Sequence, residues 1–132
     1  MKILIVEDVN IMRRVVRHIL VENYNVNDTD IYDCDSAEIA VKFVKQYSIT
    51  HIFLDINLPG MDGVDAISEI LKVNPNAYII MCTSSKSKTM LLKSIKSGAK
   101  GYLLKPISPN KVGKALNLSR QDENDDENEE TN

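Results

Sequence analysis

The residues of this chain that could do chemistry are a few acids, one hydroxyl and one lysine, each directly after a short apolar run. They are Glu7, Asp8, Asp55, Thr83 and Lys105. Carboxylate oxygens suit Mg²⁺, which takes few protein ligands and keeps several waters. A hydroxyl and a lysine suit a bound phosphoryl group. Together they supply what phosphoryl transfer needs, namely an acceptor oxygen, a metal ion, and groups that stabilise the equatorial phosphoryl oxygens.

Asp55 is placed by the stretch from His51 to Gly63. Its first part is apolar and predicts a buried strand that ends at Asp55. Pro59, Gly60 and Gly63 then break the pattern, so Asp55 lies where a strand meets a loop. A buried carboxylate is costly unless it meets a cation, hydrogen bonds or water. Taken alone, such an aspartate is more often a cap or turn residue, and the other motifs favour the functional interpretation.

An alternating order of strands and helices must position these residues. Short apolar runs predict the strands, and apolar residues at helical spacing predict the helices. The predicted strands cover residues 2–6, 30–34, 51–55, 77–82 and 101–104, and the predicted helices cover residues 11–20, 37–46, 64–71, 88–97 and 109–118. This order indicates an α/β fold with a mostly parallel sheet covered on both faces. The carboxyl ends of its strands, where ligands bind, lie side by side.

The first predicted helix carries two further expectations. Asp8 or Asn10 has a side chain suited to cap its amino end. Its apolar residues recur on one face, so Arg13, Arg14 and Arg17 are expected to face solvent.

Length and composition limit the class of protein. A chain of 132 residues is the size of one domain with a proper core. No apolar run reaches the length of a membrane span, and Met1-Lys2 leads straight into a strand without a signal peptide. Cys34 and Cys82 form no CxxC pair, which favours a reducing, cytoplasmic setting.

Charge is distributed unevenly along the chain. Residues 120–132 contain seven acids and one arginine, and such a segment cannot bury enough apolar surface to order itself. We therefore expect a domain over residues 1–119 and a disordered acidic tail over residues 120–132. Between Lys86 and Lys114 the chain has eight lysines and no acid, which would attract an acidic partner or the tail itself.

The set formed by Glu7-Asp8, Asp55, Thr83 and Lys105-Pro106 resembles the receiver domain of response regulators, the CheY-like family. The resemblance covers about residues 1–118. It implies a flavodoxin-like, doubly wound, five-stranded parallel sheet of order 2-1-3-4-5. It also implies a cis Lys105–Pro106 bond, which an X-Pro bond can adopt at low cost.

The resemblance assigns a role to each matching residue. Asp55 would accept a phosphoryl group from a phosphohistidine of a sensor histidine kinase or a histidine phosphotransfer protein. Glu7, Asp8 and Asp55 would hold Mg²⁺, or Mn²⁺ in its place, together with the main-chain carbonyl of Asn57. Lys105 would pair with the phosphoryl oxygens.

Other matching positions imply a switch. Thr83 would hydrogen-bond the phosphoryl group, and Tyr102 would turn inward when Thr83 moves. Asn57 and Ser85 occupy the positions that tune hydrolysis of the acyl phosphate. Ser84 stands where the family commonly has alanine, and it is small enough to leave Asp55 accessible.

The resemblance also implies a partner-binding face on the fourth helix, fifth strand and fifth helix. It would bind a downstream target protein through Tyr102 and the lysines Lys86, Lys88, Lys93, Lys96, Lys100, Lys111 and Lys114. The sequence has no nucleic-acid recognition motif and no aromatic platform, so nucleic acid is not expected as a partner. Receivers also dimerise through this face, which leaves a monomer or a weak homodimer.

The expected function is therefore a stand-alone phosphorylation switch, a signalling protein and not a metabolic enzyme, although it would catalyse its own phosphorylation and dephosphorylation. Two outputs stay open, a chemotaxis-type regulator and a phosphorelay intermediate or phosphate sink. A pseudo-receiver that signals by contact alone is a further alternative.

Two alternative functions come from other classes of protein. A flavodoxin-like electron carrier would need a hydroxyl-rich phosphate loop in place of Glu7-Asp8, and a haloacid-dehalogenase-like phosphatase would need an acid where Asn57 stands.

Overall fold

The computed structural model describes residues 1–84 and 88–118. The predictions for Ser85, for Lys86 and for the acidic tail over residues 120–132 lie outside the described residues. In the described part, a parallel sheet is formed by β1 (Ile3–Val6), β2 (Ile31–Cys34), β3 (His51–Asp55), β4 (Tyr78–Thr83) and β5 (Gly101–Leu104). The helices are α1 (Asn10–Tyr24), α2 (Ala37–Tyr47), α3 (Gly63–Val73), α4 (Lys88–Lys96) and α5 (Pro109–Leu116), with a short 3-10 turn η1 (Asp28–Asp30) before β2.

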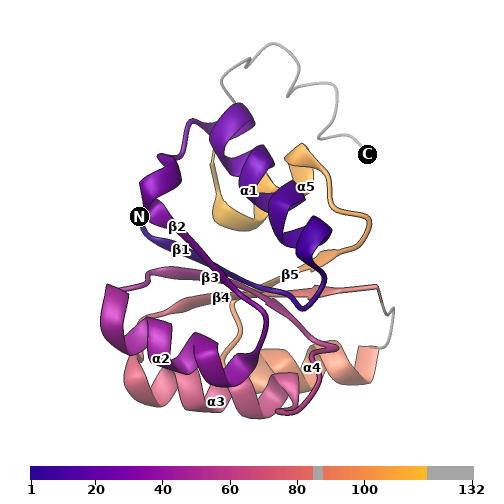
Figure 1. The fold of residues 1–132 in the computed structure, drawn as a ribbon. Helices are drawn as coiled ribbons and strands as arrows, with labels where there is room; N and C mark the ends of the chain where they lie inside the picture. The colour runs from indigo at the N-terminus through magenta and orange to yellow at the C-terminus, as the bar shows by residue number, and fades with distance from the viewer. Residues whose placement is uncertain (85–87, 119–132) are drawn as a thin grey trace.

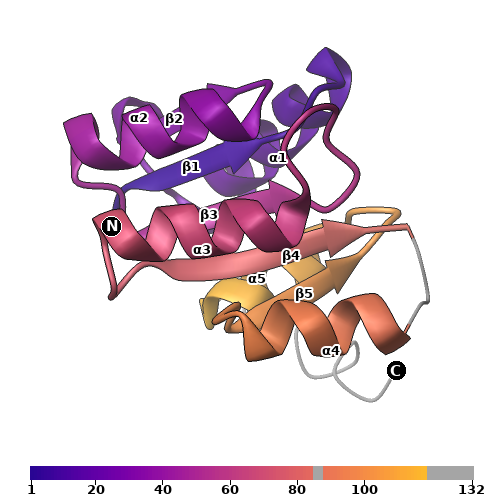
Figure 2. The same ribbon diagram turned by 90° about the horizontal axis from the view of Figure 1, so that it is seen from below.

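The strand order is β2-β1-β3-β4-β5, which confirms the predicted fold. Helices α1 and α5 cover one face of the sheet, and α2, α3 and α4 cover the other (Figure 1). Figure 2 shows the second face from the side of α3 and α4. No helix in the described residues combines the length and the apolar character that crossing a bilayer requires.

The core consists of two layers, one on each face of the sheet. Successive side chains of a strand point to opposite faces. Leu4 and Val6 of β1 therefore pack in the layer under α2 and α3, whereas Ile3 and Ile5 pack in the layer under α1 and α5. All four residues of β1 are buried and apolar, as is typical of a strand that is covered on both faces.

The register of the strands brings the polar residues together. Val6 pairs with Leu54, so Glu7, directly after β1, and Asp55, at the end of β3, lie next to each other at the carboxyl edge of the sheet. On the other side of β3, Asp55 itself pairs with Cys82 of β4. The register of the strands is therefore enough to place these residues next to one another, without any contact between their side chains.

The start of α1 corrects the cap prediction. The N-cap residue is Val9, with an extended backbone (φ −89°, ψ 113°) and no side-chain cap bond, and not Asp8 or Asn10. Asn10 is the first helical residue, and its Oδ1 accepts a hydrogen bond from Arg13 Nη2 at 3.2 Å. The Asp8 carboxylate lies beside Glu7 and Asp55, so its place in that cluster takes precedence over capping.

Most helix ends lie within one or two residues of their predicted positions. Helix α2 ends one residue later than expected, at Tyr47. Helix α5 ends at Leu116 instead of Leu118, because Asn117 adopts the left-handed conformation (φ 57°) that closes many helices. The Lys105–Pro106 peptide bond is cis, as expected.

Candidate functional site

Asp55 is the last residue of β3, and only 4% of its surface is exposed. Its two carboxylate oxygens have different partners. Oδ1 accepts a hydrogen bond from the Asn57 backbone N–H at 3.0 Å, and Oδ2 lies 3.2 Å from Lys105 Nζ. The hydrogen bond from Asn57 closes a turn directly after the strand, and it holds the carboxylate at the edge of the sheet.

Glu7 directly follows β1 and is also buried, with 5% of its surface exposed. Its Oε1 accepts a hydrogen bond from Lys105 Nζ at 2.8 Å, and its Oε2 accepts one from the Val9 backbone N–H at 3.2 Å. Burial raises the pKa of Glu7, and the neighbouring Asp55 adds to the rise, while the hydrogen bond from Lys105 opposes it. Asp8, the next residue, is exposed at the mouth of this site.

Lys105 follows β5, and its ammonium group bridges Glu7 and Asp55. Burial by itself lowers the pKa of Lys105, but the hydrogen bond and charge of Glu7 and the charge of Asp55 outweigh burial, so the pKa is raised. The lysine therefore stays charged at neutral pH, and it stabilises two carboxylates that burial would otherwise disfavour.

The site suits a hard divalent cation. One carboxylate oxygen from each of Glu7, Asp8 and Asp55 lies within 4.8 Å of the others, which brings the predicted acidic ligands together. When these three acids are ionised, they carry three negative charges against the single positive charge of Lys105. One divalent cation would neutralise the negative charge that remains. All three donors are oxygens, as Mg²⁺ prefers, and exposed Asp8 leaves room for water ligands. Asn57 lies in the adjoining loop, as predicted, and its backbone N–H contacts Asp55.

The predicted hydroxyl and aromatic residues lie on the neighbouring strands. Thr83 ends β4 and is 1% exposed, one residue beyond the Cys82 that pairs with Asp55. Ser84, the next residue, is exposed. Tyr102 in β5 has 51% of its surface exposed, so in this structure its ring is turned outward.

The predicted partner-binding face is basic in the structure. Its described lysines are all exposed and lie on α4, on the turn before β5 and on α5: Lys88, Lys93, Lys96, Lys100, Lys111 and Lys114. Two apolar side chains of α4 are exposed among them, Leu92 at 59% and Ile95 at 50%. Lys111 has an additional local role, because its Nζ donates hydrogen bonds to the carbonyls of Leu104 and Pro106.

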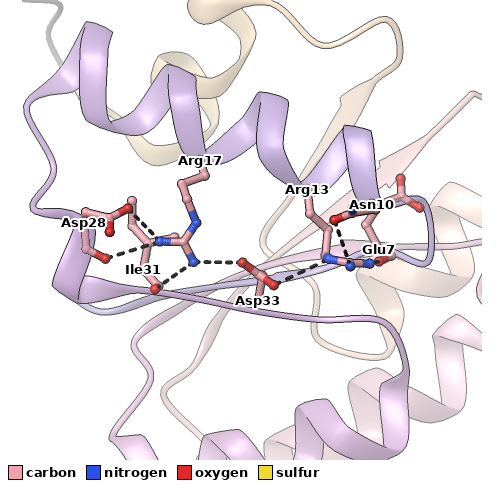
Figure 3. A network of polar contacts seen from close by, with 7 residues as sticks. All are labelled: Glu7, Asn10, Arg13, Arg17, Asp28, Ile31 and Asp33. Atoms are coloured by element: carbon pink, nitrogen blue, oxygen red, sulfur yellow. Dashed lines mark hydrogen bonds and ion pairs between the residues drawn. The ribbon is translucent and has the colours of Figure 1, made fainter.

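One part of the site was missed from the sequence. Arg13 and Arg17 were expected to face solvent, but both turn toward β2 and contact Asp33 (Figure 3). Arg13 also donates a hydrogen bond to the main-chain carbonyl of Glu7 at 2.6 Å. The signal available in the sequence was their four-residue spacing, which places both arginines on one side of a helix.

The fold and the acidic, lysine-bearing edge of its sheet define a receiver-type α/β domain. A family model for the response regulator receiver domain matches residues 3–117, and the chain belongs to this family. Receiver domains of CheY-like response regulators act as phosphoacceptors in two-component signalling, and the family binds Mg²⁺ at an acidic pocket. They take phosphoryl groups from histidine kinases or phosphotransfer proteins and bind downstream targets.

Relatives of known name are similar over most of the chain. The chemotaxis protein CheY of Thermotoga maritima is 36% identical over 117 residues, which are 88% of this chain and 94% of that protein. The CheY of Halobacterium salinarum is 35% identical over 115 residues, which are 87% of this chain and 92% of that protein. Among solved structures, CheY4 of Vibrio cholerae has a TM-score of 0.77 at 24% identity, with 88% of this chain and 95% of that chain covered. A CheY-like receiver domain protein of Methanospirillum hungatei has a TM-score of 0.76 at 23% identity, with 99% and 98% covered. These structural likenesses support the fold.

Proposed function

We propose that Asp55 is the phosphoacceptor of a chemotaxis-type response regulator and that its phosphorylation switches the binding of a partner protein. The observation that carries this proposal is the position of the Asp55 carboxylate. It is buried, bonded to Lys105, and within 4.8 Å of the carboxylates of Glu7 and Asp8. A single carboxylate is thereby held among groups that can stabilise a transferring phosphoryl group.

The transfer would use the side chains at this edge of the sheet in distinct roles. An Asp55 carboxylate oxygen forms the new P–O bond, while the P–N bond to the donor's histidine breaks and the imidazole leaves with that electron pair and takes up a proton. Lys105 pairs with an equatorial phosphoryl oxygen, and the Thr83 hydroxyl donates a hydrogen bond to another. Glu7, Asp8, Asp55 and the carbonyl of Asn57 would hold Mg²⁺, which when bound offsets negative charge on the phosphoryl oxygens.

The switch would pass from the site to the basic face. Thr83 lies in β4, two residues beyond the Met81 that pairs with Tyr102 of β5. Movement of the Thr83 hydroxyl toward a phosphoryl group would free space into which the aromatic ring can turn. Phosphorylation then shifts the equilibrium between the outward and inward positions of Tyr102. Asn57 and Ser85 would tune how long the acyl phosphate persists.

The domain assignment completes the proposal. Residues 1–119 would form the receiver. Residues 120–132 would form an acidic tail that competes with an acidic target for the partner-binding face.

The names of the relatives favour chemotaxis as the output. Binding of a target only when Asp55 is phosphorylated would support that output, whereas phosphate transfer onward to a histidine-containing protein without such binding would identify a relay.

Mass spectrometry after treatment with acetyl phosphate and Mg²⁺ tests the acceptor. The wild-type chain should gain roughly 80 Da, the mass of one phosphoryl group. Asp55→Asn should show no gain, and its fold should persist because an amide oxygen can still accept the hydrogen bond from Asn57. Asp65→Asn, which changes an exposed acid of α3, is the matched control and should be phosphorylated like the wild type. A persistent gain in Asp55→Asn, or none in the wild type, contradicts the proposal.

A further inference from the structure

Arg13 joins the acidic site to the edge strand β2 through one guanidinium group. Its Nη1 donates a hydrogen bond to the main-chain carbonyl of Glu7 at 2.6 Å, and its Nη2 donates one to Asn10 Oδ1 at 3.2 Å. Its Nε lies 3.5 Å from Asp33 Oδ1. Only 16% of the side chain is exposed, so these contacts are shielded from most water.

The carbonyl that Arg13 holds belongs to the peptide bond between Glu7 and Asp8. The N–H of Glu7 is already fixed, because it donates to the carbonyl of Cys34 at 3.1 Å. The bond from Arg13 fixes the other side of this residue's main chain. A peptide unit is planar, so fixing the Glu7 carbonyl also fixes the N–H and the Cα atom of Asp8.

Asp33 forms an ion pair with Arg13, although the buried Arg13 Nε has no hydrogen-bond partner among the described residues. Its Oδ2 lies 2.8 Å from Arg17 Nη2, and its other oxygen faces Arg13. Arg17 is held in turn by Asp28, at 2.8 Å, and by the carbonyl of Ile31, at 3.0 Å. In the part of the chain that the structure describes, the polar contacts of Arg17 are with β2 and η1 and with none of the three clustered carboxylates.

We propose that Arg13 is a positioning residue for the divalent cation, acting through the Glu7–Asp8 peptide. This inference rests on the proposed function, which assigns Glu7 and Asp8 as metal ligands. Arg13 touches neither carboxylate. It holds the backbone that carries them, with Asp33 as its anchor, so the ligands are aligned before the cation arrives.

Loss of Arg13 should weaken metal binding more than it alters the fold. Without the guanidinium, the Glu7 carbonyl has lost its charged donor, and the Glu7–Asp8 peptide can rotate. Partners that orient metal ligands typically change metal affinity 10–100-fold when they are removed. We expect the lower end here, about tenfold, because Glu7 retains its bonds to Lys105 and Val9.

Arg17 provides a matched control. It lies on the same helix and pairs with the same aspartate, and 28% of its side chain is exposed, against 16% for Arg13. Arg17→Ala removes the same charge and a part of the same network, but it leaves the bond to the Glu7 carbonyl in place.

Isothermal titration with Mg²⁺ alone, without a phosphoryl donor, tests the inference on the full-length chain. Arg13→Ala should raise the dissociation constant about tenfold, and Arg17→Ala should change it less than twofold. Amide NMR spectra without metal should show displaced Asp8 and Val9 resonances in Arg13→Ala and not in Arg17→Ala. If Arg13→Ala does not fold, Arg13→Lys and Arg17→Lys form a second pair, in which a single ammonium cannot serve all the acceptors of Arg13.

The outcomes separate the two proposals. Equal Mg²⁺ affinity in the Arg13 and Arg17 variants overturns the positioning role, while phosphorylation of the wild type still supports the proposed function. A wild-type chain that neither binds Mg²⁺ nor accepts a phosphoryl group overturns both.

Discussion

Replacing Lys105 with methionine should destabilise the fold and, at the same time, strengthen its binding of Mg²⁺. The ammonium lies 2.8 Å from Glu7 Oε1 and 3.2 Å from Asp55 Oδ2. The side chains of these two acids are only 7% and 5% exposed. Methionine keeps the apolar stem of the lysine, so the change removes a charge and little volume.

The loss of stability follows from the two carboxylates left without their cation. Breaking a buried ion pair by removing one partner costs about 3–5 kcal/mol. The Lys105 side chain is 21% exposed, so water can partly take the place of its ammonium group. We therefore expect a loss of stability of about 2–3 kcal/mol. For a domain of this size, that is a fall in melting temperature of about 10 °C.

The gain in Mg²⁺ affinity follows from the same contacts. In the wild type a divalent cation must compete with the ammonium for Glu7 and Asp55 and is repelled by it. At an effective dielectric constant of about 20, a unit and a double positive charge about 5 Å apart repel by about 7 kcal/mol. Because the lysine can move away and water screens the pair, this figure is an upper bound. We expect at least about tenfold tighter binding, or about 1.4 kcal/mol.

Urea and thermal unfolding in the presence of a chelator measure the stability, and isothermal titration measures the affinity for Mg²⁺. Lys100→Met is the control, because it removes the same charge from an exposed position. It should change stability by less than about 0.5 kcal/mol. A folded Lys105→Met chain that binds Mg²⁺ no more tightly than the wild type would refute the competition between the two cations.

Two further predictions concern parts of the fold away from the site. The pKa of His51 is lowered, mainly by burial and also by the N-terminal charge. Its contribution to stability is therefore present above pH 6.5 and lost as the pH falls through the folded-state pKa. His51→Phe should flatten the change in unfolding free energy between pH 7.5 and pH 5, and an unchanged slope in urea unfolding would contradict this. A Cβ at Gly113 would overlap the ring and hydroxyl of Tyr24, whose hydroxyl donates to the Pro109 carbonyl. Gly113→Ala should cost about 1–3 kcal/mol in thermal unfolding even after the helix preference of alanine is included. Gly101→Ala, which meets no atom within 4 Å, should be nearly neutral, and equal effects of the two changes would be evidence against the clash.

The edge of the sheet could be predicted because it depends on local patterns. Each strand is an apolar run that ends at a polar residue, and parallel strands place such ends at the same edge. Glu7, Asp55 and Lys105 are 98 residues apart at most, yet this rule alone brings them into one cluster. The register of β1 with β3 places Glu7 next to Asp55, and the Lys105 side chain reaches both carboxylates from the end of β5.

The surroundings of α1 could not be predicted because they depend on tertiary packing. The helical pattern correctly predicts that Val16, Ile19 and Leu20 of α1 are buried, although Ile11 and Val15 of the same pattern are exposed. Arg13 and Arg17 lie on the polar side of the helix. It does not show that the edge strand β2 runs past that side and presents Asp33 to both arginines. The cap prediction was wrong for a related reason, because Asp8 is used by the acidic cluster.

Glu7 is the residue at which the two networks meet, and they act on different parts of it. Lys105 contacts its carboxylate and balances charge, whereas Arg13 contacts its carbonyl and fixes geometry. Loss of Lys105 should therefore tighten Mg²⁺ binding, and loss of Arg13 should weaken it, although both changes remove one positive charge beside the same residue. A purely electrostatic account of the site gives both changes the same sign. Opposite signs would show that the orientation of the Glu7–Asp8 peptide, and not net charge alone, determines how well this edge of the sheet receives a cation.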